Sequence, residues 1–286
     1  SKNNWGWLEE SPHRDKIEVY TGDIRDFDSV KDAMKNTDVV FHLAALIGIP
    51  YSYVSPLAYI KTNIEGTYNV LQAARELNTQ KVIHTSTSEI YGTAQYVPID
   101  EKHPVNPQSP YAATKSGADQ LALTFQRSFG LPVTVIRPFN TFGPRQSARA
   151  VIPTIISQLS AGQKSIKLGN LEATRDMNYV LNTCEGFCQV GLHESSTGEV
   201  INLGSNREIS IKDLAQLIAD LMNKELEIEI DDQRIRPEKS EVERLLCDSS
   251  KARELTGWEP RYTLEEGLKE TIAWLKNHME YYKPDI

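Results

Sequence analysis

The sequence of 286 residues has few cysteines, no long hydrophobic run and no basic run. Its longest apolar stretches have the length of a β-strand, so no membrane span is predicted. Lys and Arg total 31 against 39 Asp and Glu, a formal net charge of −8, which disfavours a nucleic acid as partner. A small anionic ligand stays compatible with this charge, because a few arginines in a cleft suffice to bind it.

Three cysteines, Cys184, Cys188 and Cys247, give no even-numbered disulfide framework. Cys184 and Cys188 are four residues apart, which is the spacing of one helix face. We interpret them as small core residues of a reduced, cytoplasmic protein. No histidine or further cysteine lies nearby at ligand spacing, so no metal site is predicted.

The sequence also lacks a glycine-rich loop. A doubly wound dinucleotide fold opens with a strand, a glycine-rich turn and a helix whose N-terminus binds the pyrophosphate. The chain contains neither G-x-G-x-x-G nor G-x-x-G-x-x-G. We therefore expect that an N-terminal segment, of ~30 residues or more if it is one βαβ unit, is missing from this sequence.

Strand and helix patterns alternate in the first half of the chain. Helical patterns cover 56–77 and 109–129, and a shorter helix capped by Asp28 or Ser29 precedes the first strand. This alternation predicts right-handed crossovers and an α/β fold with a doubly wound parallel sheet, Rossmann-like but without its first βαβ unit. The strands are predicted from nearly continuous apolar, β-branched runs at 38–43, 81–86 and 132–137.

The second half of the chain has shorter helices and strands. Capping patterns at Ser210 and Thr263 open two of its helices, the second of which should extend to about Tyr281. We divide the chain into an N-terminally incomplete dinucleotide-binding domain, 1–145, and a smaller α/β substrate-binding lobe, 146–286. The second can be interleaved with the first.

Tyr111 and Lys115 are four residues apart in a helical pattern, so they should lie on one face about 5–6 Å apart. We expect the ammonium to stabilise the phenolate and to lower the tyrosine pKa from its usual value near 10. Such a phenolate can take a proton from an alcohol or a sugar hydroxyl. Thr87, Ser88 and Glu89, which follow the second predicted strand, add two hydroxyls and a carboxylate that simple alcohol oxidation does not need.

Two further segments have the character of ligand-binding strand ends. A short strand is predicted at 17–20, and Asp23 after it either accepts a hydrogen bond from an adenine amino group or lies in an ordinary turn. His42 ends the next strand and is followed by Leu43, Ala44 and Ala45. The small residues there let a ligand approach the backbone closely.

These motifs occur in the order found in one family. Their order resembles that of the extended short-chain dehydrogenase/reductases that act on nucleotide sugars, and the resemblance covers nearly the whole chain. The matching segments are GDI near 23, HLAA near 43, NIEGTYN at 63–69, STSEIYG at 86–92, YAATK at 111–115 and RPFNTFGPR at 137–145.

The triplet Thr87-Ser88-Glu89 is similar to that of GDP-mannose 4,6-dehydratases. The resemblance implies that Tyr111 takes the 4-hydroxyl proton while NAD takes the C4 hydride, which later returns to C6. Lys115 would hold the cofactor ribose, and Thr87 would hydrogen-bond the 4-oxygen. Glu89 would remove the C5 proton, and Ser88 would assist departure of the 6-hydroxyl.

The resemblance also implies the ligands and the assembly: NAD as cofactor with NADP not excluded, a nucleotide-diphosphate hexose as substrate, and a homodimer formed through a four-helix bundle of the two long helices. Arginines suit the diphosphate because their planar fork matches phosphate oxygens. The implied cofactor contacts are Asp23, Ile24, Leu43, Ala44, Ala45, Thr62, Tyr111, Lys115, Pro138 and Asn140. The implied substrate contacts are Asn140, Arg145, Val151, Ile152, Lys167, Gly169, Arg175 and Arg236.

Three functions remain open. The first is a nucleotide-sugar 4,6-dehydratase, and the second is a UDP-glucuronate decarboxylase or sugar 4-epimerase of the same fold. Decarboxylases share Thr-Ser-Glu and a segment like Asn140–Arg145, whereas the continuation Gln146–Pro153 is more similar to bacterial dehydratases of N-acetylglucosamine nucleotides. The third is a non-catalytic nucleotide-sugar-binding protein, which would not need the intact set of catalytic residues.

Overall fold

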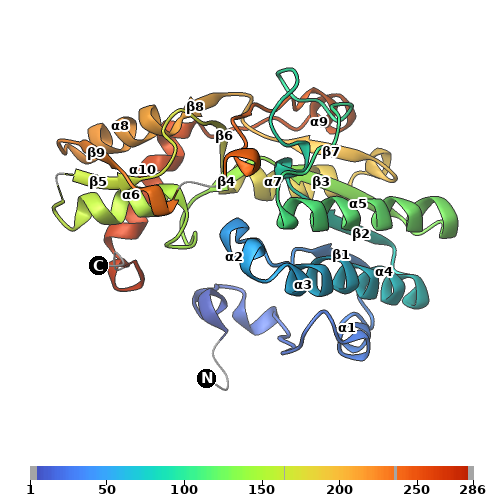
Figure 1. Ribbon diagram of the computed structural model, residues 1–286. Helices are drawn as coiled ribbons and strands as arrows, with labels where there is room; N and C mark the ends of the chain where they lie inside the picture. Colours follow the sequence, from blue (N-terminus) through green and yellow to red (C-terminus); the bar gives the residue numbers. More distant parts are fainter. Residues whose placement is uncertain (1–4, 164, 235–236, 283–286) are drawn as a thin grey trace.

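Four parallel strands form the larger sheet, in the order β1-β2-β3-β7. The computed structural model describes residues 5–163, 165–234 and 237–282. The three predicted strands are β1, β2 and β3, and the predicted parallel α/β architecture is confirmed (Figure 1). The strands are β1 (Val39–His42), β2 (Lys81–Thr85), β3 (Val133–Pro138) and β7 (Val200–Leu203).

Helices cover both faces of this sheet. Val82 and Val135 pack on α4 and α5, while their neighbours Ile83 and Ile136 point to the opposite face and pack on α7. This period of two explains why the strands are apolar throughout, since each side chain is buried whichever face it occupies. The covering helices are α4 (Gly66–Leu77), α5 (Pro110–Phe129), α7 (Val180–Leu192) and α9 (Ser250–Thr256).

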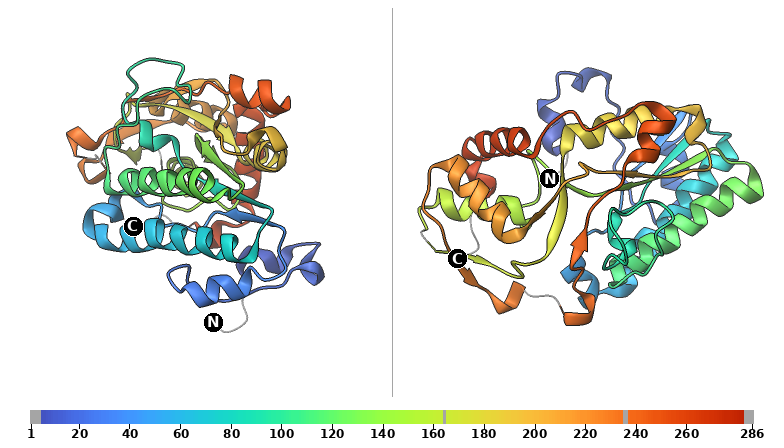
Figure 2. Two further views of the ribbon diagram at one scale, coloured as in Figure 1. Left: turned by 90° about the vertical axis from the view of Figure 1, so that its right-hand side faces the viewer. Right: turned by 90° about the horizontal axis from the view of Figure 1, so that it is seen from above.

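A smaller lobe lies beside this sheet (Figure 1, Figure 2). In it β6 pairs in parallel with β4 and β10 and antiparallel with β8, and β5 pairs with β9. Three helices, α6, α8 and α10, share one hydrophobic core. Its elements are β4 (Asn140–Phe142), β5 (Ser165–Leu168), β6 (Thr174–Tyr179), β8 (Glu208–Ser210), β9 (Glu227–Ile230), β10 (Arg244–Leu245), α6 (Val151–Ser160), α8 (Ile211–Met222) and α10 (Leu264–Lys276).

The chain crosses between the two sheets several times. β4 follows β3 after one residue, and α7 follows β6 directly and returns to pack on β2 and β3. β7, from the second half of the sequence, then takes its place beside β3. The larger sheet is therefore built from both halves of the chain.

The two long predicted helices are present. Ser109 caps α5, because its hydroxyl accepts a hydrogen bond from the Ala112 amide at 3.1 Å, and Gly130 ends the helix with a φ of +70°. The other helical stretch consists of α3 (Pro56–Tyr59), a π-helical turn (Ile60–Glu65) and α4. The π-helical turn was not predicted from the sequence.

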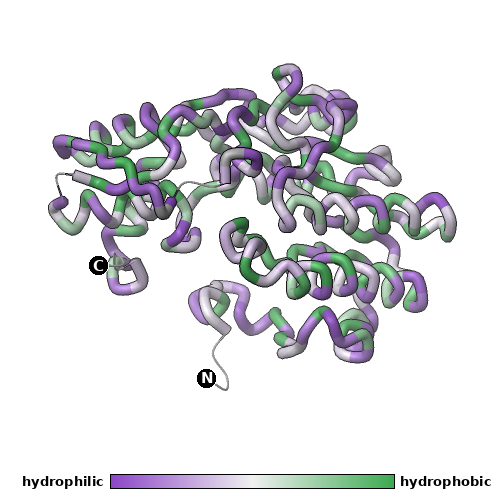
Figure 3. Tube along the Cα trace, in the orientation of Figure 1, coloured by the Kyte–Doolittle hydropathy of each residue, from purple (hydrophilic) through white to green (hydrophobic). Residues whose placement is uncertain are grey.

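Hydrophobic and hydrophilic positions alternate along α4 and α5, as expected of helices that bury one face (Figure 3). Among the described residues, no helix combines the length and apolarity that crossing a bilayer requires.

Two local predictions near the start of the chain are wrong. Residues 17–20 have no strand structure, because no strand of the described chain pairs with them. The cap of α1 (Phe27–Ala33) is Asp26, whose carboxylate accepts hydrogen bonds from the amides of Asp28 and Ser29. The two residues that we expected to cap are therefore the donors to that cap.

Two predictions in the second half also need correction. The last helix, α10, ends at Lys276, and only a 3₁₀ turn (Met279–Tyr281) continues toward the predicted end. Cys184 and Cys188 are exposed on α7 and are not core residues, since the buried face of that helix is formed by other positions. One further short helix, α2 (Ile49–Val54), lies between β1 and α3.

The capping box of α10 gives a test of local stability. The Thr263 hydroxyl accepts the Glu266 amide at 3.2 Å, and the Glu266 carboxylate accepts the Thr263 amide at 2.8 Å. We predict that Thr263→Ala lowers the free energy of unfolding by about 1 kcal/mol, measured by urea denaturation. Thr263→Ser keeps the oxygen and should lose much less; equal losses in both variants would contradict the capping role.

Candidate active site

The carboxyl ends of β1, β2 and β3 lie at one edge of the parallel sheet, where α/β proteins bind ligands. Leu43–Ala45 follow β1, Ser86–Glu89 follow β2, and Asn140 follows β3 after one residue. The first two turns of α5 carry Tyr111 and Lys115. The sequence motifs thus come from four elements that the fold brings to the same edge.

Thr87, Ser88 and Glu89 lead from β2 into a short 3₁₀ turn, Ser88–Tyr91. The Thr87 hydroxyl caps this turn by accepting a hydrogen bond from the Glu89 amide at 3.3 Å. All three side chains are buried, with exposed fractions of 8%, 2% and 8%. Two hydroxyls and a carboxylate are therefore held inside the protein at the end of a strand.

Tyr111 and Lys115 are buried beside this triplet. The phenol takes part in a hydrogen bond with Thr87, and the charge of Glu89 acts on it. The Lys115 ammonium donates a hydrogen bond to the Thr85 carbonyl at 2.5 Å, which ties the helix to the end of β2. The structure thus brings together all five residues to which we assigned chemistry.

Burial raises the pKa of Tyr111 above its ordinary value of 10; the Thr87 hydrogen bond opposes this shift and the Glu89 charge adds to it. Our expectation that Lys115 lowers the Tyr111 pKa is therefore wrong for this structure. Burial lowers the pKa of Lys115 itself, from 10.5 to about 8, against the opposing charge of Asp119. Desolvation is thus the largest cause of the pKa shift at both residues.

The sheet edge offers polar atoms that the protein leaves unsatisfied. Asn140 Oδ1 and Thr85 Oγ1 are buried, and neither has a hydrogen-bond partner within the described residues. After β1, Leu43 is 61% exposed and Ala44 is exposed, while Ala45 and Pro138 are half-buried. Unpaired buried acceptors next to small exposed residues fit a polar ligand that lies along this edge.

Asp23 lies some distance along the chain from this centre, in a turn of its own. Its carboxylate accepts the Arg25 amide at 2.9 Å and the guanidinium at 2.5 Å, and these hydrogen bonds lower the Asp23 pKa to about 2. Ile24 packs against Gly66 at the start of α4, and Thr62 lies in the π-helical turn. A cavity of about 330 Å³ opens here, lined by Asp23, Arg25, Asp26, Lys61 and Glu65.

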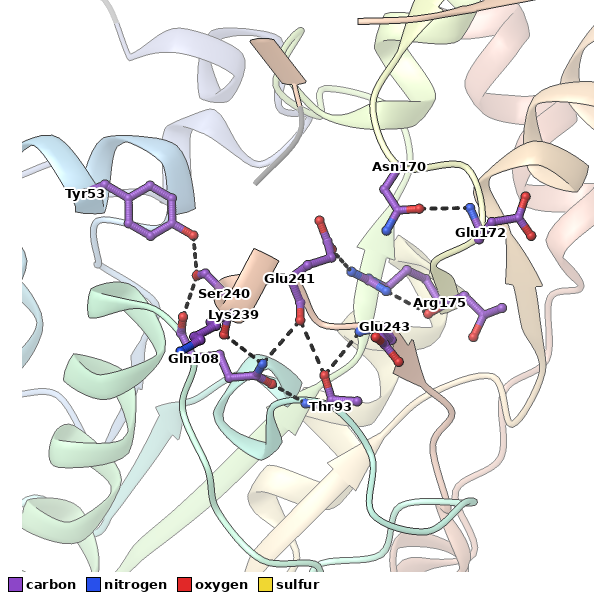
Figure 4. A network of polar contacts seen from close by, with 11 residues as sticks. Tyr53, Thr93, Gln108, Asn170, Glu172, Arg175, Lys239, Ser240, Glu241 and Glu243 are labelled. Atoms are coloured by element: carbon purple, nitrogen blue, oxygen red, sulfur yellow. Dashed lines mark hydrogen bonds and ion pairs between the residues drawn. The ribbon is translucent and has the colours of Figure 1, made fainter. Parts of the chain in front are cut away.

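Arg175, which we predicted to bind the diphosphate, is held by another side chain. It lies in β6, is 6% exposed, and pairs with the Glu241 carboxylate at 3.2 Å (Figure 4). Its guanidinium also donates to the Thr174 carbonyl at 2.9 Å. The second predicted arginine, Arg236, lies outside the described residues.

Glu241 belongs to a segment that joins the two lobes; we call residues 237–243 the strap. The Ser240 hydroxyl lies 2.6 Å from the Tyr53 hydroxyl of α2 and donates to the Gln108 carbonyl at 2.5 Å (Figure 4). The Gln108 amide donates to the Glu241 carbonyl at 3.2 Å. Because Gln108 immediately precedes the cap of α5, the strap connects Arg175 to the helix that carries Tyr111.

Two predicted substrate contacts have other environments. Arg145 is exposed with a φ of +68°, and its guanidinium lies over the rings of Trp7, at 5.8 Å, and Trp274, at 5.9 Å. The guanidinium is thus in a cation–π arrangement with two aromatic rings. Ile152 is 1% exposed in the core of the smaller lobe, so its side chain is not available to a nucleotide base.

The remaining predicted substrate contacts lie around α6 and β5. Val151 is half-buried at the start of α6, and Lys167 is exposed on β5. A side chain at Gly169 would come within 2.7 Å of the Arg234 carbonyl oxygen, so only glycine fits there. Gly169 thus lets the chain before the strap approach the end of β5.

A family model described as GDP-mannose 4,6 dehydratase matches residues 1–271 of the chain. The chain belongs to this GDP-mannose 4,6-dehydratase family. This confirms the resemblance to extended short-chain dehydrogenase/reductases on which the site residues were chosen. Nucleotide-sugar dehydratases and epimerases both occur among its relatives.

The relatives differ in the reaction that they catalyse. A dTDP-glucose 4,6-dehydratase of Streptomyces antibioticus is 30% identical over 98% of this chain and 82% of its own length. A UDP-glucuronate 4-epimerase of Thermodesulfobacterium geofontis is 33% identical over 96% of this chain and 84% of its own. The solved structure of a dTDP-glucose 4,6-dehydratase from Streptomyces venezuelae, with NAD bound, matches with a TM-score of 0.84 and 28% identity, covering 92% and 80% of the two chains.

Two buried polar residues close to the Tyr111–Lys115 pair, Asn63 and Asp119, were not identified from the sequence. Asn63 is buried in the π-helical turn and donates to the Thr114 hydroxyl at 3.0 Å, which in turn donates to the Tyr111 carbonyl at 2.8 Å. Asp119 is fully buried one helical turn after Lys115. Its spacing of four from Lys115 was visible in the sequence, whereas the contacts of Asn63 were not. Within the described residues no group of His, Cys, Asp and Glu is arranged to hold a metal ion.

The buried Lys115 makes stability depend on pH. Its pKa falls from 10.5 in the unfolded chain to about 8 in the fold, so below pH 8 the fold carries the full cost of a buried ammonium, about 3 kcal/mol. This cost declines as pH rises through 8 and is gone above 10.5. We predict that Lys115→Met raises the free energy of unfolding near neutral pH and that the gain shrinks toward pH 10.5, measured by denaturant titration. Lys212→Met, at an exposed position of α8, is the control; a gain that does not change with pH would contradict the prediction.

Proposed function

We propose that this protein is an NAD-dependent nucleotide-sugar 4,6-dehydratase, a carbon–oxygen lyase. The observation that carries the proposal is the buried carboxylate of Glu89, next to Ser88 and within electrostatic reach of the Tyr111 phenol. Oxidation and reduction at C4 need the tyrosine, lysine and threonine, but only an elimination needs a second base.

The first chemical task is removal of the C4 hydroxyl proton, which we assign to Tyr111. Thr87, which is hydrogen-bonded to the phenol, is placed to hold the same oxygen. Lys115 supplies a positive charge from one helical turn away. Because Tyr111 is desolvated and has a raised pKa, it acts as a base only when cationic groups flank it, and this ties proton removal to a filled site.

The second task is elimination of water across C5 and C6. A ketone at C4 acidifies the C5 proton, and we assign removal of this proton to Glu89. The proton that Glu89 takes from C5 is the one that the 6-hydroxyl needs to leave as water, and Ser88 assists its transfer. The two side chains are adjacent in a rigid 3₁₀ turn, so acid and base are delivered to neighbouring carbons together.

The cofactor residues fit a dinucleotide at two positions. Lys115 and Asn140, with its unpaired Oδ1, would hold the nicotinamide riboside along the sheet edge, beside Leu43–Ala45 and Pro138. Asp23 lines the cavity beside the π-helical turn, and together with its neighbour Ile24 and with Thr62 of that turn it would hold the adenosine end. When bound, oxidised nicotinamide would accept the hydride from C4 of the sugar and would bring a positively charged ring next to that carbon. We favour NAD because a similar solved dehydratase holds it; NADP stays possible.

The substrate would be a nucleotide-diphosphate hexose, with Arg175 as its diphosphate ligand. A buried guanidinium already oriented by Glu241 and the Thr174 carbonyl has little rotamer entropy to lose on binding. Val151, Lys167 and Gly169 would lie near the nucleotide. Arg145 and Ile152 are left out of the proposed substrate site for the reasons given above.

A 4-epimerase is the second candidate, because a relative of that name is 33% identical. Such a reaction would use Tyr111, Lys115 and Thr87 and leave Glu89 without a chemical task. A decarboxylase would use the same three residues. The buried Ser88–Glu89 pair is the reason for preferring the dehydratase over the epimerase. Decarboxylases share the Thr-Ser-Glu triplet, so the preference over a decarboxylase rests on the similarity of Gln146–Pro153 to bacterial dehydratases.

We also propose a homodimer and a cytoplasmic location. Leu57, Ile60 and Tyr68 expose about half of their surface on the stretch from α3 to α4, and Phe129 does so at the end of α5. A bundle of these helices with those of a second copy would cover them. All three cysteines are free thiols in the structure, as expected in a reducing compartment.

The direct test of the proposed function is a panel of UDP-, GDP- and dTDP-hexoses incubated with the protein and NAD, read by mass spectrometry. A dehydratase yields a product lighter than its substrate by one water. A product of unchanged mass but altered sugar configuration would identify an epimerase instead, and release of carbon dioxide from a glucuronate would identify a decarboxylase.

Glu89→Gln tests the elimination step separately. The variant keeps the size of the side chain but lacks the base, so we predict that C4 oxidation continues while turnover falls by at least about 100-fold. In deuterated water the C5 hydrogen should then no longer exchange with solvent, as measured by mass spectrometry of recovered sugar. Tyr111→Phe is the matched control, since it should stop oxidation as well. Normal C5 exchange in Glu89→Gln would remove Glu89 from the mechanism.

A further inference from the structure

Asp119 is a buried carboxylate to which the proposed mechanism gives no role. It is 0% exposed and lies one helical turn after Lys115 and two after Tyr111, on the face of α5 that meets the sheet. An ionised carboxylate in such a place is expensive unless charged or polar partners compensate it.

Two residues on the sheet side donate hydrogen bonds to this carboxylate, and a histidine lies beside it. Oδ2 accepts a hydrogen bond from the Ser86 hydroxyl at 2.8 Å and one from Arg137 Nε at 3.2 Å, and Oδ1 lies 3.3 Å from His84 Nε2. Ser86 and His84 belong to β2 and its end, and Arg137 belongs to β3. These contacts keep the Asp119 pKa below its ordinary value although burial alone would raise it.

The Arg137 guanidinium has a hydrogen-bond partner besides Asp119. Arg137 donates to the Tyr91 hydroxyl at 2.9 Å, and that hydroxyl donates to Asn202 at 2.8 Å. Arg137 is therefore compensated by Asp119 on one side and by a neutral chain of hydrogen bonds on the other. Asp119 forms the end of this network that lies on α5. Its negative charge is therefore on the same helix as Lys115 and Tyr111.

Both residues of the catalytic pair respond to that charge. Asp119 raises the pKa of Lys115, opposing its desolvation, and it also raises the pKa of Tyr111. Burial lowers the pKa of His84 below its ordinary value, and the neighbouring Asp119 opposes this shift. Five charged or titratable groups surround Lys115, Tyr111 and Asp119. They are Arg137 on β3, His84 on β2, His42 on β1, Glu89 in the 3₁₀ turn and Tyr59 at the end of α3.

We propose that Asp119 is a positioning residue of the active site. Its buried carboxylate, held by hydrogen bonds from Ser86 and Arg137, keeps the Lys115 ammonium charged one helical turn from Tyr111. The assignment of roles to Lys115 and Tyr111 rests on the proposed function. The presence of an anion near Lys115 does not rest on it, and it can be measured without turnover.

The test is a pH titration of Lys115 by NMR of isotope-labelled lysine, with the signal assigned by its loss in Lys115→Met. In the wild-type protein the midpoint should lie near 8. In Asp119→Asn we expect it to fall by about one pH unit, because a neighbouring opposite charge is lost. Asp119→Glu keeps the charge, and Ser86→Ala removes one hydrogen bond without removing charge, so both should leave the midpoint in place.

Asp119→Asn also leaves the buried Arg137 without its anion, which can cost enough stability to prevent folding. Asp119→Asn combined with Arg137→Met removes both charges and keeps the network neutral. The midpoint should still fall in this double variant, because Asp119, not Arg137, acts on the Lys115 ammonium.

The rate profile gives a second, independent readout. The pH profile of turnover can be measured with any nucleotide sugar that the protein converts. Both its acidic and its basic limb should move to lower pH in Asp119→Asn, because the Asp119 carboxylate raises the pKa values of Lys115 and Tyr111. A variant that loses only stability or maximal rate, with both limbs and the Lys115 midpoint unmoved, would overturn the proposal. If no substrate turns over, the proposed function fails, and the NMR titration still decides whether Asp119 holds the charge of Lys115.

Discussion

The burial of one ammonium and one phenol on the first turns of α5 is the constraint on which the rest of the site depends. Each charged form would be better solvated in water, and contacts with the end of β2 and with Asp119 of α5 itself compensate part of the cost of burial. Thr85 and Thr87 at the end of β2 hold the pair from the sheet, and the Asp119 carboxylate opposes the loss of charge from Lys115. Desolvation thus favours the uncharged form of both groups.

This constraint also explains the structure around the pair. Ser109, Asn63 and the strap each fix the start of α5 from a different direction: by a cap, by a hydrogen bond to Thr114, and through Gln108. A helix that could shift by one ångström would lose the alignment between Tyr111 and the triplet after β2. The strap adds a connection to Arg175, so β6 of the smaller lobe and α5 beside the larger sheet are held by one segment.

The sequence predicted what depends on local pattern. Apolar runs and caps located three strands and the two long helices, and a spacing of four placed Tyr111 and Lys115 on one face. It could not predict contacts between distant segments, such as Arg175 with Glu241, 66 residues apart, or Tyr53 with Ser240, 187 apart. The raised Tyr111 pKa was missed for a related reason, because desolvation depends on the whole fold and not on the spacing of two residues.

The same reasoning separates a dehydratase from an epimerase on this fold. Both reactions need a desolvated tyrosine whose basicity returns when the site is filled, so a buried Tyr111–Lys115 pair does not distinguish them. An epimerase must let the oxidised sugar present either face to the hydride, which needs space around the ring. A dehydratase must hold the ring still while two carbons react. Ser88 and Glu89, fixed in a buried 3₁₀ turn next to the phenol, suit the second requirement and would restrict the first.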